Sequence, residues 1–247
     1  MTDPVLFAGP SIFGLDPGLF SGIDLKPPAA CGDLLAAVLA GATAIGLVDG
    51  SFENVPSVWH KEILYALSLG VTVLGAASMG ALRAAECARF GMVGVGEIFV
   101  EFASGSRTAD ADVAVVHAPR DLHYRPLTLA LVDAEATIAS IREAGALPAE
   151  LCDTLVAAAR ALHFKDRTWP ELIAQSGLPS GSAPAIETAL SRCERSVKRE
   201  DAMLLIEQLR KGSQPRPASI TPGRLARTDF LTLLEQRVRA ERLGYRP

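Results

Sequence analysis

The stretch VTVLGAASMGALRAAE, residues Val71 to Glu86, decides the fold of this chain. It opens with an apolar run that ends at a glycine, which is typical of a buried strand. Small residues follow at Ala76, Ala77 and Gly80, and a helix-like segment completes the stretch. We therefore predict a strand, a tight turn that presents Ser78, and a helix.

Similar apolar runs elsewhere in the first half predict further buried strands. They are Val5–Ala8, Ala44–Val48 and Val113–His117. Helix-like stretches lie around Asp33–Ala40, Val58–Leu69 and Gly80–Phe90. Strands that alternate with helices imply mostly parallel pairing, so the N-terminal half is predicted to be α/β, with a mostly parallel sheet and flanking helices.

The second half has a helical pattern, which predicts an all-helical region. Helix-period segments fall near Leu127–Glu143, Pro148–Leu162, Trp169–Ser176, Pro184–Lys198 and Asp201–Lys211. We expect an α/β core domain over residues 1–126 and a helical region over residues 127–247. Residues 212–223, GSQPRPASITPG, are predicted to be a linker because they are rich in Pro, Gly and Ser.

A last helix is predicted over about Asp229–Leu243. Its apolar residues Phe230, Leu233, Leu234 and Val238 are expected to share one face. That face would pack on the rest of the chain or dock another protein, and the pattern leaves both interpretations open.

Composition narrows the class of protein. With 49% hydrophobic and 21% charged residues the chain is an ordinary globular protein, and its net charge of −4 favours neither nucleic acid nor a membrane surface as partner. The four cysteines are far apart, which fits no zinc or redox motif. The start MTDPVLFAGP has an acid where a signal peptide would carry basic residues, and no apolar run approaches the roughly 20 residues that span a bilayer. We expect a cytoplasmic protein.

The turn at Ser78 has two interpretations. The pattern Ala76-x-Ser78-x-Gly80 is similar to the nucleophile elbow G-x-S-x-G, in which small neighbours let the serine hydroxyl project from a sharp turn. Free N–H groups of the following helix would then stabilise an oxyanion. Alternatively, Ser78 simply caps the helix, since serine is a good N-cap residue. A nucleophilic serine also needs a base, and spacing singles out none of the four histidines.

Lys61 is a second candidate base. Pro56 and Ser57 signal a helix start shortly before it, so Lys61 is predicted to lie in the first turns of a helix. The helix dipole disfavours a cation there and thereby favours the neutral amine that a general base needs. The other interpretation is an exposed lysine whose charge is balanced by Glu62.

Several strings together resemble the TfuA-like family, whose members work with YcaO enzymes to make thioamides in peptide backbones. The strings are FAGPS (7–11), IGLVDGSFENVPSVWHKEIL (45–64), GVTVLGAASMGALRAAE (70–86), FGMVGVGEIF (90–99), DADVAVVHA (110–118) and YRPLT (124–128). Each string alone is a weak signal, but their order and spacing are specific. The resemblance covers about Phe7 to Leu127.

The resemblance implies a chemistry. A YcaO enzyme uses ATP to activate an amide oxygen of its peptide or protein substrate, and the TfuA-like protein supplies sulfur from a ThiS-like sulfur-carrier protein by hydrolysing its C-terminal thiocarboxylate. A Ser–Lys pair is associated with the family, and Ser78 and Lys61 are the matching positions. Neither a metal nor a cofactor is implied.

Other side chains are candidates for contact with the substrate. Arg83 would meet the negative charge of the carrier tail, Ser11 would line the same crevice, and His60 would orient the substrate or Lys61. The alternatives are an exposed helix arginine and a packed histidine. Asp49 would hold Lys61 by a salt bridge or cap local turns.

Two other functions compete with hydrolysis. One is a non-catalytic adaptor or allosteric partner that raises the affinity of YcaO for its peptide. The other is nucleotide or phosphate binding at the helix after Ser78, which has less support because neither G-x-G-x-x-G nor G-x-x-x-x-G-K-[ST] occurs.

Overall fold

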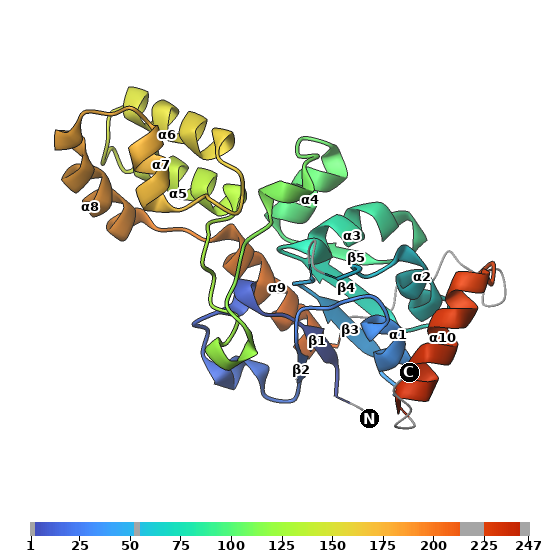
Figure 1. Cartoon of the computed structure of the whole chain (residues 1–247). Helices are drawn as coiled ribbons and strands as arrows, with labels where there is room; N and C mark the ends of the chain where they lie inside the picture. The colour runs from blue at the N-terminus through green and yellow to red at the C-terminus, as the bar shows by residue number, and fades with distance from the viewer. Residues whose placement is uncertain (1–2, 52–54, 213–224, 243–247) are drawn as a thin grey trace. The chain divides into compact units, whose positions relative to one another are not determined.

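A five-stranded sheet forms the centre of the N-terminal half. The computed structural model describes residues 3–51, 55–212 and 225–242. All strands are parallel, in the order β2-β1-β3-β4-β5 (Figure 1). The strands are β1 (Val5–Phe7), β2 (Asp24–Lys26), β3 (Ala44–Leu47), β4 (Thr72–Ala76) and β5 (Val93–Val95). The predicted α/β class, with a mostly parallel sheet, is confirmed.

The strand order determines where a ligand would bind. The chain winds from β1 outward to β2 on one side and to β3, β4 and β5 on the other, so the winding reverses between β1 and β3. Because every strand is parallel, all carboxyl ends meet at one edge of the sheet. Ligands of such sheets bind beyond that edge, near the point of reversal.

The two outer strands were not predicted. Every residue of β2 is exposed, so the strand has no apolar run to reveal it. The strand β5 has only three residues and includes Gly94, which is unusual in a strand. Both strands owe their structure to pairing with β1 and β4 rather than to local sequence.

One face of the sheet is covered by three helices. They are α1 (Asp33–Leu39), α2 (His60–Ser68) and α3 (Met79–Cys87). Alternate strand residues point to this face, among them Phe7, Leu47 and Val73, and pack against Leu34 and Ile63 of the helices. These helices agree with the predicted stretches to within two residues at each end, except that the last residues of the third form a 3-10 turn, Ala88–Phe90.

The other face is covered by a helix from much later in the chain. This helix is α9 (Val197–Arg210). The strand residues that alternate with those of the first face, such as Leu6 and Leu74, pack against its apolar residues Ala202, Leu205, Ile206 and Leu209. A Cβ atom at Gly46 of β3 would lie 2.7 Å from Leu205 Cδ2, so the glycine lets α9 approach the sheet closely. The second face of the sheet is therefore covered by residues that follow the helical region in the chain.

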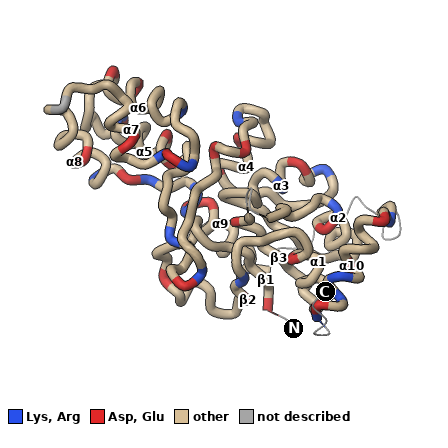
Figure 2. Tube along the Cα trace, in the orientation of Figure 1, with Lys and Arg blue, Asp and Glu red and all other residues tan. Residues whose placement is uncertain are grey.

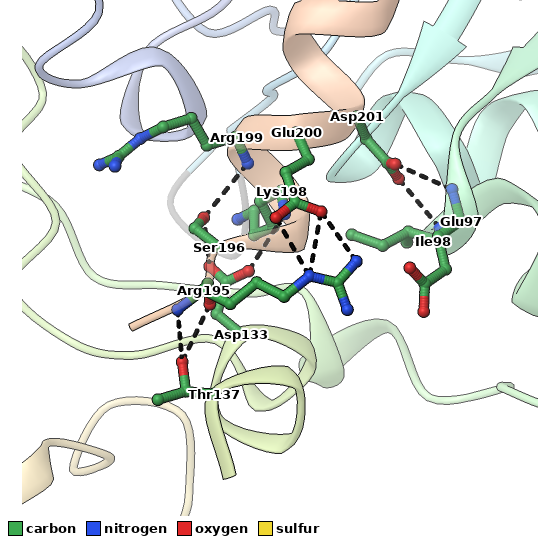
Figure 3. Close-up of polar contacts among 10 residues, drawn as sticks. All are labelled: Glu97, Ile98, Asp133, Thr137, Arg195, Ser196, Lys198, Arg199, Glu200 and Asp201. Carbon is green, nitrogen blue, oxygen red and sulfur yellow. Dashed lines mark hydrogen bonds and ion pairs between the residues drawn. The ribbon is translucent and has the colours of Figure 1, made fainter. Parts of the chain in front are cut away.

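The same helix also stabilises the loop after β5. Asp201 accepts hydrogen bonds from the backbone N–H groups of Glu97 (2.8 Å) and Ile98 (2.9 Å), the first residues of α4 (Glu97–Ser104) (Figure 3). A Cβ atom at Gly96 would lie 2.1 Å from the Asp201 carboxyl carbon. Asp201 thus caps α4 in place of a residue from the loop itself.

The chain divides into two compact units. The first comprises residues 1–108 together with 201–247, and the second comprises residues 109–200. The predicted boundary after residue 126 differs from this division, because the end of α9 packs on the sheet and residues 109–126 belong with the helices. Residues 213–223 of the predicted linker lie outside the described residues. No helix of the described residues is long and apolar enough to cross a membrane.

The second unit is a helical bundle. Its main helices are α5 (Leu131–Glu143), α6 (Ala149–Ala161), α7 (Trp169–Gln175) and α8 (Ala183–Cys193), which share an apolar core. Half-buried Asp133 in α5 accepts hydrogen bonds from the Ser196 hydroxyl and the Lys198 N–H, both at 3.1 Å (Figure 3). The predicted helical C-terminal half is confirmed.

The predicted strand Val113–His117 is wrong. Only His117 makes a bridge, an isolated antiparallel one with Pro126. The Val113 carbonyl accepts from Lys198 Nζ (2.6 Å), and the Val116 N–H donates to Thr128 Oγ1 (2.8 Å). Side chains therefore satisfy backbone groups that a strand would use in a ladder.

The last helix, α10 (Asp229–Arg242), packs on α1. Its buried residues are Leu231, Leu234 and Val238, whereas Phe230 and Leu233 are exposed by 68% and 62%. The predicted apolar face was therefore partly wrong. It included the exposed Phe230 and Leu233 and omitted the buried Leu231. Basic and acidic residues both lie along the helix (Figure 2), and some pair within it.

Candidate active site

Ser78 follows a strained turn at the carboxyl end of β4. The Ser78 N–H donates to the Ala76 carbonyl at 2.8 Å, and the residue between them, Ala77, has a φ of +67°. This is a γ-turn with a positive central φ, a rare conformation that costs a residue with a Cβ atom of order 1–3 kcal/mol. In this turn the chain passes from strand to helix within two residues.

The Ser78 side chain does not cap the helix that it precedes. Ser78 occupies the N-cap position of α3, but its hydroxyl makes no capping hydrogen bond. The N–H group of Gly80, which such a cap would satisfy, donates to the Val48 carbonyl at 3.1 Å. The interpretation that the Ser78 hydroxyl caps the helix is therefore wrong. Ser78 is half-buried, and its role as a nucleophile stays a prediction.

The first turn of α3 offers one N–H group to an incoming oxyanion. Gly80 donates to Val48, and Ala81 donates to the Ser78 carbonyl at 2.9 Å. Among the described residues, the Met79 N–H has no hydrogen-bond acceptor. We expected several free N–H groups in this turn, but of the N–H groups of Met79, Gly80 and Ala81 the structure leaves only that of Met79 without an acceptor within the described part of the chain. In a nucleophile elbow the residue after the serine supplies this donor.

Glycines let α3 approach the sheet closely. A Cβ atom at Gly80 would lie 1.8 Å from the Leu47 carbonyl oxygen, and one at Gly75 would lie 2.1 Å from the Gly80 carbonyl oxygen. Both clashes are with backbone atoms, which cannot move aside as a side chain can. These two glycines therefore determine how deeply the first turn of α3 sits against β3 and β4.

Asp49 and Ser11 lie at the ends of the two neighbouring strands, β3 and β1. Asp49 Oδ2 accepts from the Gly9 N–H (2.8 Å) and the Ser11 N–H (3.0 Å), and Asp49 Oδ1 accepts from Ser11 Oγ (2.7 Å). Asp49 is 1% exposed and Ser11 5%. Asp49 thus caps the turn after β1, one of the two roles that we considered. Because its only hydroxyl proton is used, Ser11 can offer a ligand only an acceptor.

Replacing Asp49 tests this arrangement. We expect Asp49→Ala to lower the free energy of unfolding by about 2–3 kcal/mol, because two buried N–H groups lose their acceptor. Asp49→Asn should cost less, since its amide oxygen can still accept from both. Urea unfolding measures the change, and Asp24→Ala, at an exposed carboxylate, is the matched control. Equal stability of Asp49→Ala and wild type would contradict the assigned hydrogen bonds.

Lys61 lies in the first turn of α2, as predicted, and contacts the C-terminal segment. Its Nζ donates to the Ala226 carbonyl at 3.3 Å. Glu62 does not balance the charge of Lys61. The Glu62 carboxylate is fully buried and accepts from the N–H groups of Gly32 (2.9 Å) and Trp59 (3.1 Å), and burial raises its pKa. The alternative in which Glu62 neutralises Lys61 is therefore wrong.

His60 and Arg83 are held by other protein groups. His60 Nε2 and Glu86 Oε2 lie 2.7 Å apart, and Arg83 also binds Glu86, at 2.7 Å. Arg83 Nε donates to the Val58 carbonyl at 3.0 Å. Arg83 is thus no free helix arginine, and His60 is half-exposed rather than packed in the core. Their contact with a substrate stays a prediction.

These contacts place the start of α2 along α3. His60 pairs with Glu86, which follows Ser78 by eight residues along α3. Because a helix rises 1.5 Å per residue, Glu86 lies about 12 Å from Ser78 along the helix axis. The structure thus joins Ser11 with Asp49, and His60 with Arg83 through Glu86. The contact between Ser78 and Lys61 stays a prediction.

Sequence comparison supports the resemblance. Residues 49–168 match the family model described as TfuA-like protein, a range that includes Lys61 and Ser78 but not Ser11. No curated protein matches the chain. The match agrees with the motifs at the carboxyl ends of β3 and β4. Residues 49–168 therefore carry a TfuA-like domain, and the TfuA-like family is associated with YcaO-dependent thioamidation.

Proposed function

We propose that this protein hydrolyses the C-terminal thiocarboxylate of a ThiS-like sulfur-carrier protein and so supplies sulfide to a YcaO enzyme that thioamidates a peptide. The turn at Ser78 is the observation that carries the proposal. Its hydroxyl makes no capping bond, it stands at the ligand-binding edge of a parallel sheet, and it precedes the unbonded N–H of Met79.

In the first step the Ser78 oxygen attacks the thiocarboxylate carbon. The C–O bond forms, the Met79 N–H stabilises the oxyanion, and the C–S bond then breaks. The Ser78 proton passes to the base and from there to the departing sulfur, so hydrosulfide leaves. Water next hydrolyses the ester, which restores Ser78 and releases the carrier as a carboxylate.

Lys61 is the proposed base. Its amine, when neutral, would accept the Ser78 proton, and for this it must exchange its present acceptor, the Ala226 carbonyl. At 3.3 Å and exposed to solvent, that hydrogen bond is weak, with a net worth of about 1 kcal/mol or less. The exchange is therefore accessible energetically.

Trapping of the intermediate tests the proposal. We expect the wild-type chain, mixed with a thiocarboxylated ThiS-like protein, to release sulfide and to form a covalent adduct that survives acid quenching. Mass spectrometry of the digest should place the carrier C-terminus on Ser78. An adduct on another residue would contradict the role of Ser78.

A non-catalytic adaptor or allosteric partner of YcaO is the second candidate. The hydrogen bond from Lys61 to the Ala226 carbonyl favours it, because that bond competes with the proposed role of Lys61 as a base. An adaptor would raise the affinity of YcaO for its peptide without releasing sulfide. Assays of sulfide release in the absence of YcaO separate the two functions.

A further inference from the structure

The C-terminal helix contacts the segment that carries the proposed base. Besides the Lys61–Ala226 hydrogen bond, the ring of Phe230 meets that of Trp59 edge to face, with centroids 5.3 Å apart. Trp59 immediately precedes α2, and Lys61 lies in its first turn. Ala226, three residues before α10, and Phe230 in its first turn therefore both contact the start of α2.

The rest of α10 is attached to α1 by a small interface. Leu234 and Val238 pack against Leu35, and Arg237 donates to the Cys31 carbonyl at 3.0 Å. Only three residues of α10 are buried among those described, whereas α9 places four on the sheet. A helix held by so few buried side chains can detach without unfolding the sheet.

We propose that α10 is an autoinhibitory strap, which holds Lys61 on the Ala226 carbonyl and away from Ser78 until the helix is displaced. The inference depends on the proposed function, because it assumes that Lys61 must reach Ser78. It gives a function to the hydrogen bond between Lys61 and a carbonyl 165 residues later in the chain.

Displacing α10 releases both restraints at once. Ala226 leaves Lys61, and Phe230 leaves Trp59, so the start of α2 can move and the lysine amine can turn toward Ser78. The population of the active arrangement, and with it kcat, would rise, while KM for the carrier would change little.

Two neighbouring leucines provide a matched test. Leu234→Glu puts a charge into the interface with α1, whereas Leu233→Glu makes the same change at a residue that is 62% exposed. We expect Leu234→Glu to raise kcat for sulfide release by up to about fivefold, and Leu233→Glu to leave it unchanged. Lys61→Ala combined with Leu234→Glu should abolish the gain.

Trp59 reports detachment independently of activity. The chain has two tryptophans, so in a Trp169→Phe background the fluorescence comes from Trp59 alone. Loss of Phe230 should shift the emission to longer wavelength in Leu234→Glu and not in Leu233→Glu. Leu234→Ala, which weakens the interface without adding a charge, is the second variant should Leu234→Glu fail to fold.

The outcomes separate this inference from the proposed function. A shift of Trp59 emission with an unchanged or lower kcat would overturn the strap, whereas the Ser78 adduct would still support hydrolysis. A gain that persists in the Lys61→Ala background would also overturn it. Absence of both sulfide release and adduct in every variant would instead refute the proposed function.

Discussion

Ser78→Ala should lower sulfide release from a thiocarboxylated carrier by about 10³-fold or more, since the residue that forms the covalent bond is lost. The fold should be nearly unaffected. Removing a serine that caps a helix costs about 1 kcal/mol, but the Ser78 hydroxyl makes no capping bond. We therefore expect a large loss of activity with a change in unfolding free energy below about 1 kcal/mol.

The control for this variant is Ser104→Ala. Ser104 is an exposed serine at the end of α4, and its hydroxyl donates to the Glu101 carbonyl. Its removal should leave sulfide release unchanged. If Ser78→Ala released sulfide at the wild-type rate, the hydrolase proposal would fail, and the adaptor function would be favoured.

Gly80→Ala should strongly destabilise the sheet unit. The new Cβ atom would lie 1.8 Å from the Leu47 carbonyl oxygen and 2.6 Å from the Leu47 carbonyl carbon. Alanine gains about 1 kcal/mol over glycine from helix propensity, but this cannot offset a clash with the backbone of a buried strand. We expect a loss of about 4 kcal/mol or more, measured by urea unfolding.

Gly181→Ala is the matched control, because a Cβ atom at Gly181 meets nothing within 4 Å. Its stability should stay within about 0.5 kcal/mol of the wild type. If Gly80→Ala were equally stable, the first turn of α3 could not lie as close to β3 as the structure places it.

Local sequence predicted the elements around Ser78 well. The strands β1, β3 and β4 are apolar runs buried on both faces, and the helices after them have clear periodicity, so local pattern and tertiary environment agree. The strand at Val113–His117 was wrong because apolar character does not reveal that Lys198 and Thr128, distant in sequence, bind its backbone.

The polar contacts of the candidate site were harder to predict. The proximity of Ser11 and Asp49 follows from adjacent parallel strands, and the rule that carboxyl ends share an edge could have identified it. The partners of Lys61 and Glu62 could not be predicted, since Ala226 offers a backbone carbonyl and Gly32 a backbone N–H, which every residue possesses. The amino-acid types at these positions therefore do not reveal such contacts.

The position of α9 in the chain has a consequence for synthesis of the protein. The helix that covers the second face of the sheet follows the whole helical unit, residues 109–200. At about 5–20 residues per second, a ribosome needs roughly 5–20 s to make the approximately 100 residues between Thr108 and Leu209. During that interval Leu6 and Leu74 remain uncovered by α9, so this face of the nascent sheet exposes apolar surface until α9 is made.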